Sequence, residues 1–83
     1  MEEIKFWLEQ WFSGKSAMAI EEVRELSQNN YFESGLVDSF GFITLLSDIE
    51  EKYGVTFSNE DFLDRSFATI DGLVQMIYSK KNN

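Results

Sequence analysis

Hydrophobic side chains recur at every third or fourth position in three stretches of the chain, the spacing that predicts amphipathic helices. The first stretch predicts a helix from Glu2 to Ser13 that Gly14 ends. Its apolar face consists of Ile4, Trp7, Leu8, Trp11 and Phe12, and its other side carries Glu2, Phe6, Glu9 and Gln10. Because glutamates rather than lysines flank the apolar face, we expect it to be buried in a core and not to bind a membrane surface.

The second helical stretch runs from about Ser39 to Tyr53 and has a signal at each end. Asp38 is suited to cap its first turn, and Gly54 suits the left-handed position that follows a helix. Its inward side consists of Phe42, Leu45, Leu46, Ile49 and Tyr53, and its outward side of Phe40, Ile43, Thr44, Ser47 and Glu51. Two different faces predict two roles, one in the core and one toward a partner.

A long connection, residues 15 to 38, lies between these two helices and contains one short helix, Ile20 to Leu26. Asn29, Asn30 and Gly35 are turn-forming residues, so we expect the rest of the connection to be a loop. Its large hydrophobic residues are predicted to pin the loop onto the core: Tyr31, Phe32, Leu36 and Val37.

Two more helices are predicted after Gly54. The run 58–61, Ser-Asn-Glu-Asp, fits a capping box that opens a short helix through Asp64, with Phe62 pointing inward. Thr69 caps the last helix, in which Gly72 is expected to cost little; its inward face consists of Ile70, Leu73, Val74, Met76 and Ile77, and it ends with Lys80 and Lys81. The predicted fold is therefore all-α, a small four-helix bundle with a short third helix and a long loop between helices 1 and 2.

Composition limits what such a bundle does. The 83 residues suffice for one domain, residues 1–83, with one modest core. The chain contains no cysteine and no histidine, which removes thiolate nucleophiles, imidazole bases and the usual zinc ligands, so we expect a protein that is not an enzyme. Its net charge of −8 disfavours nucleic acid and anionic membranes and favours a protein partner with a basic patch.

The ends and the apolar runs of the chain bear on location. No apolar run approaches the roughly 20 residues that cross a bilayer, so no membrane insertion is expected. The N-terminus lacks the basic start and apolar run of a secretory signal. We therefore expect a cytoplasmic protein, and a monomer.

Asp38 and Ser39 form the most informative pair, because the serine stands at the mouth of an amphipathic helix. In the plainer interpretation, Asp38 is an ordinary N-cap and Ser39 an ordinary first-turn residue. A serine hydroxyl is a poor nucleophile without a base, and the chain has no histidine to supply one. The helix N-terminus, however, is a favourable place for a phosphodiester, and the base can come from another enzyme.

The segment Gly35-Leu36-Val37-Asp38-Ser39-Phe40 and the stretches around it resemble the acyl carrier protein family. The likeness covers nearly the whole chain, including 49–54 (Ile-Glu-Glu-Lys-Tyr-Gly), 55–57 (Val-Thr-Phe) and 67–70 (Phe-Ala-Thr-Ile); Phe40 stands where the family usually has leucine. It implies that a phosphopantetheinyl transferase moves 4′-phosphopantetheine from coenzyme A to Ser39, with Asp38 assisting. The arm then holds an acyl or aminoacyl thioester, which the protein shuttles between enzymes of a biosynthetic pathway.

The resemblance also implies partners and a docking face. An AMP-forming ligase or an acyltransferase would load the thiol, and downstream enzymes would consume the acyl group. The docking residues would be Phe40, Ile43, Thr44, Ser47, Glu50 and Glu51, with Asp48 as a further acid. Gly41 and Thr44 stand where carriers of fatty acid synthesis usually have acids, so docking is expected to rely more on hydrophobic contact.

Two questions stay open at the level of sequence. Phe40 either projects toward a partner or folds back onto the loop aromatics Tyr31 and Phe32. The chain is either a modified carrier or an unmodified helical adaptor with an acidic, aromatic docking surface, and a Ser39→Ala variant separates these two. Paired acids such as Glu60 and Asp61 could suggest metal or acid-base chemistry, but a solvated helix surface explains them.

Overall fold

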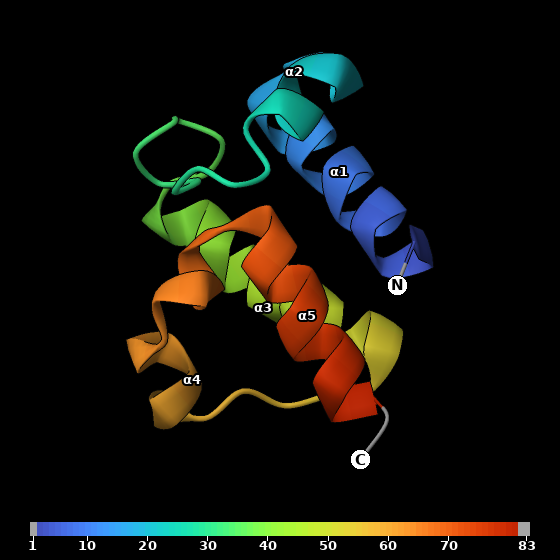
Figure 1. Cartoon of the computed structure of the whole chain (residues 1–83), viewed down its shortest axis with the longest axis vertical. Coiled ribbons are helices and arrows are strands. Elements are labelled where there is room, and N and C mark those ends of the chain that lie inside the picture. Colours follow the sequence, from blue (N-terminus) through green and yellow to red (C-terminus); the bar gives the residue numbers. More distant parts are fainter. Residues whose placement is uncertain (1, 82–83) are drawn as a thin grey trace.

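The computed structural model describes residues 2–81, and that part of the chain contains helices and loops without strands (Figure 1). Its elements are α1 (Glu2–Ser16), α2 (Ile20–Glu25), α3 (Ser39–Tyr53), α4 (Asn59–Leu63), the 3-10 helix η1 (Arg65–Ala68) and α5 (Ile70–Lys81). The all-α fold with a short helix before the last one is confirmed. The sequence pattern did not predict η1.

The core lies where α1, α3 and α5 turn their apolar faces toward one another. Its buried hydrophobic residues are Ile4, Leu8, Phe12, Val23, Tyr31, Leu36, Val37, Leu45, Ile49, Val55, Phe67, Ile70, Leu73, Val74 and Ile77. Trp7, Trp11, Phe42, Leu46, Tyr53 and Met76 are partly buried and pack against this cluster. The three predicted inward faces are thus confirmed. A hydrogen bond of 2.7 Å from Trp11 Nε1 to Asp48 Oδ2 also joins α1 to α3.

The end of α1 differs from the prediction, because the helix continues past Gly14 to Ser16. Ala17, with φ 62°, takes the left-handed position that ends the helix, and its amide donates a hydrogen bond of 3.0 Å to the Ser13 carbonyl. Gly14 keeps a helical backbone. The prediction that Gly14 ends the helix was wrong, because glycine permits the left-handed backbone that ends a helix but does not impose it.

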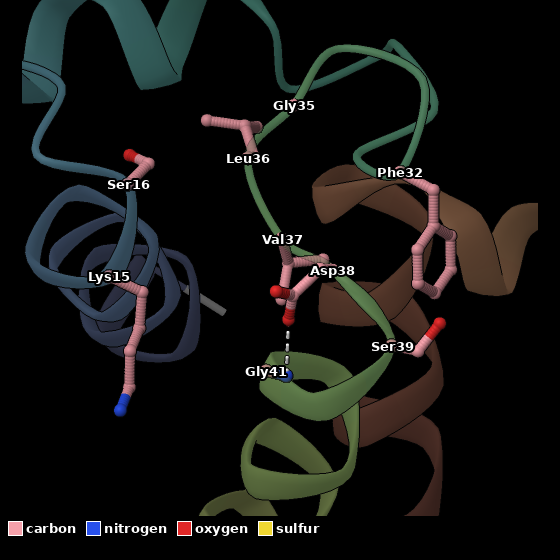
Figure 2. Close-up of a pocket in the computed structure, with 9 residues that line it drawn as sticks. All are labelled: Lys15, Ser16, Phe32, Gly35, Leu36, Val37, Asp38, Ser39 and Gly41. Carbon is pink, nitrogen blue, oxygen red and sulfur yellow. Dashed lines mark hydrogen bonds between the residues drawn. The ribbon is translucent and has the colours of Figure 1, made fainter.

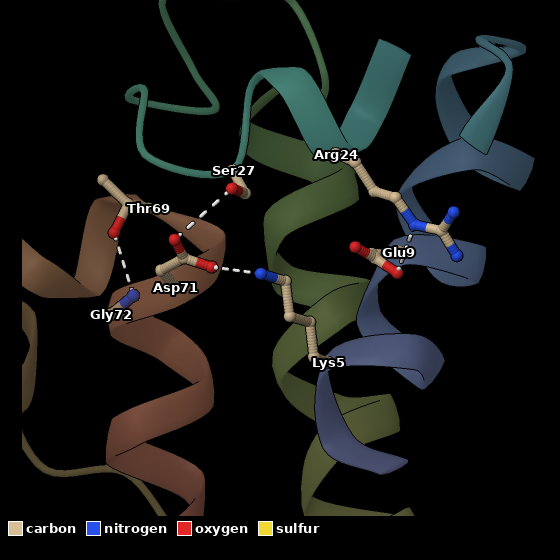
Figure 3. A network of polar contacts seen from close by, with 7 residues as sticks. All are labelled: Lys5, Glu9, Arg24, Ser27, Thr69, Asp71 and Gly72. Atoms are coloured by element: carbon tan, nitrogen blue, oxygen red, sulfur yellow. Dashed lines mark hydrogen bonds and ion pairs between the residues drawn. The ribbon is translucent and has the colours of Figure 1, made fainter. Parts of the chain in front are cut away.

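Glu9 is also not where periodicity placed it. Its side chain is 4% exposed, because α2 packs across α1 and covers this side of the helix. Arg24 of α2 donates a hydrogen bond of 3.1 Å from Nε to Glu9 Oε1, which pairs the buried carboxylate with a cation (Figure 3). The expectation that Glu9 lies on an outward face was therefore wrong, whereas Phe6 does project, with half of its surface exposed.

Both ends of α3 are confirmed. Asp38 is the N-cap, and Gly54 follows the helix at φ 67°, where its amide donates a hydrogen bond of 2.9 Å to the Glu50 carbonyl. The loop before α3 is held by Tyr31, whose hydroxyl donates to the Phe67 carbonyl and whose burial raises its pKa above the ordinary value. The loop thus fixes where α3 begins.

The capping box of α4 is confirmed, with the Ser58 amide donating a hydrogen bond of 2.8 Å to Asp61 Oδ2. Asp61 also pairs with Lys80 of α5 at 2.8 Å, which ties α4 to the end of α5. Phe62 does not point fully inward. Its side chain is 44% exposed, because α4 is one short turn lying at the surface and only one side of the ring can contact Phe42 and Phe67.

Gly72 has a larger role than predicted. A Cβ at this position would lie 1.9 Å from the Ser66 carbonyl oxygen, so η1 can cross the first turn of α5 only where a side chain is missing. The Gly72 amide donates a hydrogen bond of 3.0 Å to Thr69 Oγ1, which confirms Thr69 as the cap of this helix. The expectation that Gly72 costs little missed this close approach.

Candidate functional site

Ser39 is the first residue of α3, and its side chain is exposed beside the loop that precedes the helix (Figure 2). Within the described part of the chain its hydroxyl has no hydrogen-bond partner, so the oxygen is open to an incoming group. Tyr31 fixes the backbone that leads into Ser39, because its carbonyl accepts hydrogen bonds from the amides of Leu36 and Val37, at 3.0 and 3.3 Å. The serine is thus presented from a fixed backbone.

Asp38 holds the start of α3. Its Oδ1 accepts a hydrogen bond of 2.7 Å from the Gly41 amide, which satisfies one of the free amides of the first helical turn. The side chain as a whole is exposed, and Oδ2 has no partner among the residues that the structure describes. Asp38 is therefore an N-cap with one oxygen still available for a ligand or a metal ion brought by a partner.

An open depression of about 760 Å³ lies against this pair of residues. It is lined by Lys15 and Ser16 from the end of α1, by Phe32, Gly35, Leu36 and Val37 from the loop, and by Asp38, Ser39 and Gly41. In Figure 2 the Phe32 ring points toward Ser39, whereas Lys15 lies on the side of Asp38 and Gly41. Lys15 is the one cation among these lining residues, and Asp38 is the one anion.

Sequence reasoning did not assign Lys15, Phe32 or Gly41 to the site. Only the fold brings Lys15, from the end of α1, to the depression, because it is remote from Ser39 in the chain. Phe32 lies in the loop directly before α3, and no local pattern shows toward which side its ring points. Gly41 could have been noticed in the sequence, since a glycine in the first turn of a helix lowers helix stability and therefore needs a reason. A Cβ there would lie 2.7 Å from Val37 Cγ2 and 3.2 Å from Asp38 Oδ1.

The outward face of α3 continues from Ser39 along the helix. Phe40 is 83% exposed and Ile43 is 66% exposed, and the other predicted docking residues are exposed as well: Thr44, Ser47, Glu50 and Glu51. The idea that Phe40 folds back onto the loop is wrong, because Phe32 occupies that place with its ring centroid 5.1 Å from that of Tyr31. The structure thus brings all six residues to one surface.

The acids near this face are not equivalent. Asp48 accepts the Trp11 hydrogen bond described above and is partly buried, so it serves the core contact between α1 and α3. Glu50 Oε2 accepts a hydrogen bond of 3.4 Å from the Phe57 amide. Glu51 has neither contact. Within residues 2–81, no group of three or more acids forms a metal site, and no helix is long and apolar enough to cross a membrane.

The geometry at Ser39 fits a phosphodiester. The oxygen is open to solvent, a depression is adjacent, and the free amides of a helix N-terminus favour negative charge at that position. The chain contains no histidine, the usual general base for a serine, and no base is hydrogen-bonded to the Ser39 hydroxyl within the described residues. The site suits a serine that another enzyme modifies.

Comparison with known proteins gives one finding. Neither the curated proteins nor the solved structures contain a match. The family model described as "phosphopantetheine attachment site" matches residues 15–77 of the 83. Members of this family carry 4′-phosphopantetheine and are carriers, which work with a phosphopantetheinyl transferase and acyl-handling enzymes. The chain belongs to the phosphopantetheine-carrying acyl carrier protein family.

Proposed function

We propose that Ser39 receives the phosphopantetheine arm and that the chain shuttles an acyl or aminoacyl group between enzymes of a biosynthetic pathway. The observation that supports Ser39 most strongly is its exposed, unbonded hydroxyl at the first position of α3, next to a depression and a capping aspartate. We take residues 1–83 as one carrier domain. We expect it to act as a monomer in the cytoplasm, the compartment that contains coenzyme A and ATP-using ligases.

Attachment is a phosphoryl transfer in which a partner supplies the base. Ser39 Oγ forms a bond to the phosphorus that carries pantetheine in coenzyme A. The pyrophosphate bond breaks, adenosine 3′,5′-bisphosphate leaves, and the transferase takes the serine proton. Asp38 keeps the first turn of α3 in place through Gly41, and its second oxygen faces solvent, where it can orient a hydrated magnesium ion on the coenzyme.

Carrying is a matter of reach and docking. When attached, phosphopantetheine supplies a thiol that holds an acyl group as a thioester on a flexible arm. A tether of this kind raises the effective concentration of its load near any enzyme docked on the protein. The chain itself contributes a rigid anchor and a docking face, and the enzymes that load and consume the acyl group contribute the catalysis.

The docking face is the outward side of α3: Phe40, Ile43, Thr44, Ser47, Glu50 and Glu51. Phe40 and Ile43 place exposed apolar surface within one turn of Ser39, and Glu50 and Glu51 place charge at the far end of the helix. We propose that an apolar pocket with basic residues beyond it covers this face, in an AMP-forming ligase or an acyltransferase as well as in the transferase.

The test is the intact mass of the chain before and after incubation with coenzyme A, magnesium and a broad-specificity phosphopantetheinyl transferase. The parent is expected to gain one phosphopantetheine, and Ser39→Ala to gain none. Ser16→Ala is a matched control, because Ser16 lines the same depression but donates its hydroxyl to the Phe12 carbonyl at 2.7 Å. No gain with several transferases would instead favour an unmodified adaptor.

A further inference from the structure

Aromatic rings fill the space between α3 and the segments that face it below Ser39. Phe42, one turn after Ser39, lies at the centre of this group. Its ring centroid is 5.0 Å from that of Phe32, 5.5 Å from that of Phe67, 6.1 Å from that of Tyr31 and 6.3 Å from that of Phe62. Phe57 extends the group, 5.4 Å from Phe67. These six rings come from the loop, α3, the 54–58 connection, α4 and η1.

The rings also separate Ser39 from the interior. Figure 2 shows the Phe32 ring beside the Ser39 side chain. The Phe32 amide donates a hydrogen bond of 2.9 Å to Asn30 Oδ1, and its ring packs on Tyr31 and Phe42 while 41% of the residue's surface stays exposed. A group attached to Ser39 that turned toward the core would therefore meet Phe32 first and Phe42 next.

Below this layer the core is already closed. Leu36, Leu45, Ile49 and Leu73 are each at most 1% exposed. The open depression beside Ser39 runs the other way, toward Lys15 and Ser16 at the end of α1 (Figure 2). An alkyl chain could enter the bundle only by pushing rings out of contact with one another, which gives up packing that the chain already has.

We propose that Phe42 closes the bundle to the cargo, so that this carrier holds a short acyl or aminoacyl group in solvent and not a long alkyl chain in its interior. The inference rests on the proposed attachment at Ser39 and adds a substrate class and a specificity-determining residue to it. The cargo is small enough to need no shelter, and its thioester stays accessible to any nucleophile of the docked enzyme.

The experiment loads the chain with acetyl- or octanoyl-coenzyme A and a transferase, and intact mass confirms loading first. The rate at which hydroxylamine cleaves each thioester is then compared with its rate on the free acyl-pantetheine. We expect both groups to be cleaved within a factor of about two of the free compounds, because neither is sheltered. We also expect the acetyl and octanoyl forms to melt at the same temperature.

Variants locate the barrier. Phe42→Ala should make room for the octanoyl chain, which then becomes about tenfold more slowly cleaved than in the parent, while the acetyl form is unaffected. Phe42→Leu serves if Phe42→Ala does not fold, as judged by its circular dichroism. Phe6→Ala removes an exposed ring on α1, far from Ser39 in sequence and outside the ring group, and should change neither rate.

The outcomes separate the two claims. A parent that gains no mass overturns attachment at Ser39, and this inference with it. A parent that gains mass but cleaves octanoyl about tenfold more slowly than the free thioester, with a higher melting temperature, overturns this inference alone. Absence of protection in a folded Phe42→Ala chain overturns the role given to Phe42.

Discussion

Asp38 Oδ1 accepts a hydrogen bond of 2.7 Å from the Gly41 amide, and this contact holds the first turn of α3 directly beside Ser39. Because the contact is an N-cap, replacing Asp38 by alanine should lower the free energy of unfolding by about 1 kcal/mol, and replacing it by asparagine by only a few tenths. Urea unfolding measures both. Equal stability of the parent and Asp38→Ala would contradict the capping role.

The same pair of variants separates stability from chemistry. Asp38→Asn keeps the cap but removes the charge, so we expect it to fold like the parent and to take up phosphopantetheine more slowly. The measurement is the initial rate of mass gain with the transferase. If Asp38→Asn is loaded as fast as the parent, the carboxylate acts only as a cap.

Gly72 and Gly14 make a matched pair for the packing of the bundle. A Cβ at Gly72 would meet the Ser66 carbonyl oxygen at 1.9 Å, whereas one at Gly14 would meet nothing within 4 Å. Gly72→Ala should therefore destabilise by roughly 1 to 3 kcal/mol through overpacking. Gly14→Ala should stabilise by about 0.5 to 1 kcal/mol, because alanine is the better helix former inside α1. A Gly72→Ala chain as stable as the parent would refute the assigned contact.

Phe40 is expected to matter for docking and not for folding. With 83% of its surface exposed, Phe40→Ala should leave the free energy of unfolding unchanged. If a partner pocket buries the ring, the same variant weakens binding by about 2 kcal/mol, roughly thirtyfold in Kd. Glu51→Gln removes an exposed charge and should cost only about 0 to 1 kcal/mol. Calorimetric titration against the transferase compares them, and parent-like binding by Phe40→Ala would end the proposal.

The ion pair of Asp61 and Lys80 predicts a pH dependence. The hydrogen bond from Lys80, followed by that from the Ser58 amide, lowers the pKa of Asp61 from its ordinary value of 3.8. A carboxyl with a lowered pKa in the folded state contributes stability above its ordinary pKa and loses it as pH falls through the folded value. Lys80→Met should thus be less stable than the parent at neutral pH, and the difference should shrink below pH 3.8.

Urea midpoints measured over a pH series check this dependence. Lys81→Met is the control, because Lys81 Nζ lies 5.1 Å from the centre of the Tyr53 ring and pairs with no carboxylate among residues 2–81. A destabilisation by Lys80→Met that stays constant into the acid range would show that the pair does not contribute.

Net charge gives a further prediction. Fifteen carboxylates against seven basic residues repel one another, so salt should raise the melting temperature by screening. Since the described residues form no cluster of three or more metal-ligating groups, magnesium chloride and sodium chloride should act alike at equal ionic strength. An unchanged melting temperature in both salts would remove the repulsion argument.

Local signals in the sequence were enough for both ends of α3 and for the starts of α4 and α5. The side chains of Asp38 and Thr69 each accept a hydrogen bond from an amide in the first turn of the helix that follows, and the Ser58 amide donates one to Asp61. Gly54 takes the left-handed backbone after α3, so neighbouring residues decide these boundaries. The same locality made Ser39 recognisable as the start of a helix. Periodicity, likewise local, identified the core faces.

What the sequence could not predict depends on segments that meet only in the fold. Glu9 is buried because α2 crosses α1, and Gly72 is required because η1 crosses α5. Lys15, at the rim of the depression, comes from a remote segment too, whereas the direction of the Phe32 ring depends on its packing against Tyr31 and Phe42. Phe40 is a related case. The sequence permitted either an exposed ring or one folded onto the loop, and the packing of Phe32 on Tyr31 leaves Phe40 exposed.

The most direct test of the account is to locate the modification in the loaded chain. Tryptic digestion yields the peptide 25–52, which contains Ser27, Ser34, Ser39 and Ser47. Fragmentation of this peptide by electron transfer breaks the backbone on both sides of each serine. We predict that the phosphopantetheine mass appears between Asp38 and Phe40, on Ser39. The same mass on another serine, or a peptide without it after incubation with active transferase, would contradict the central claim.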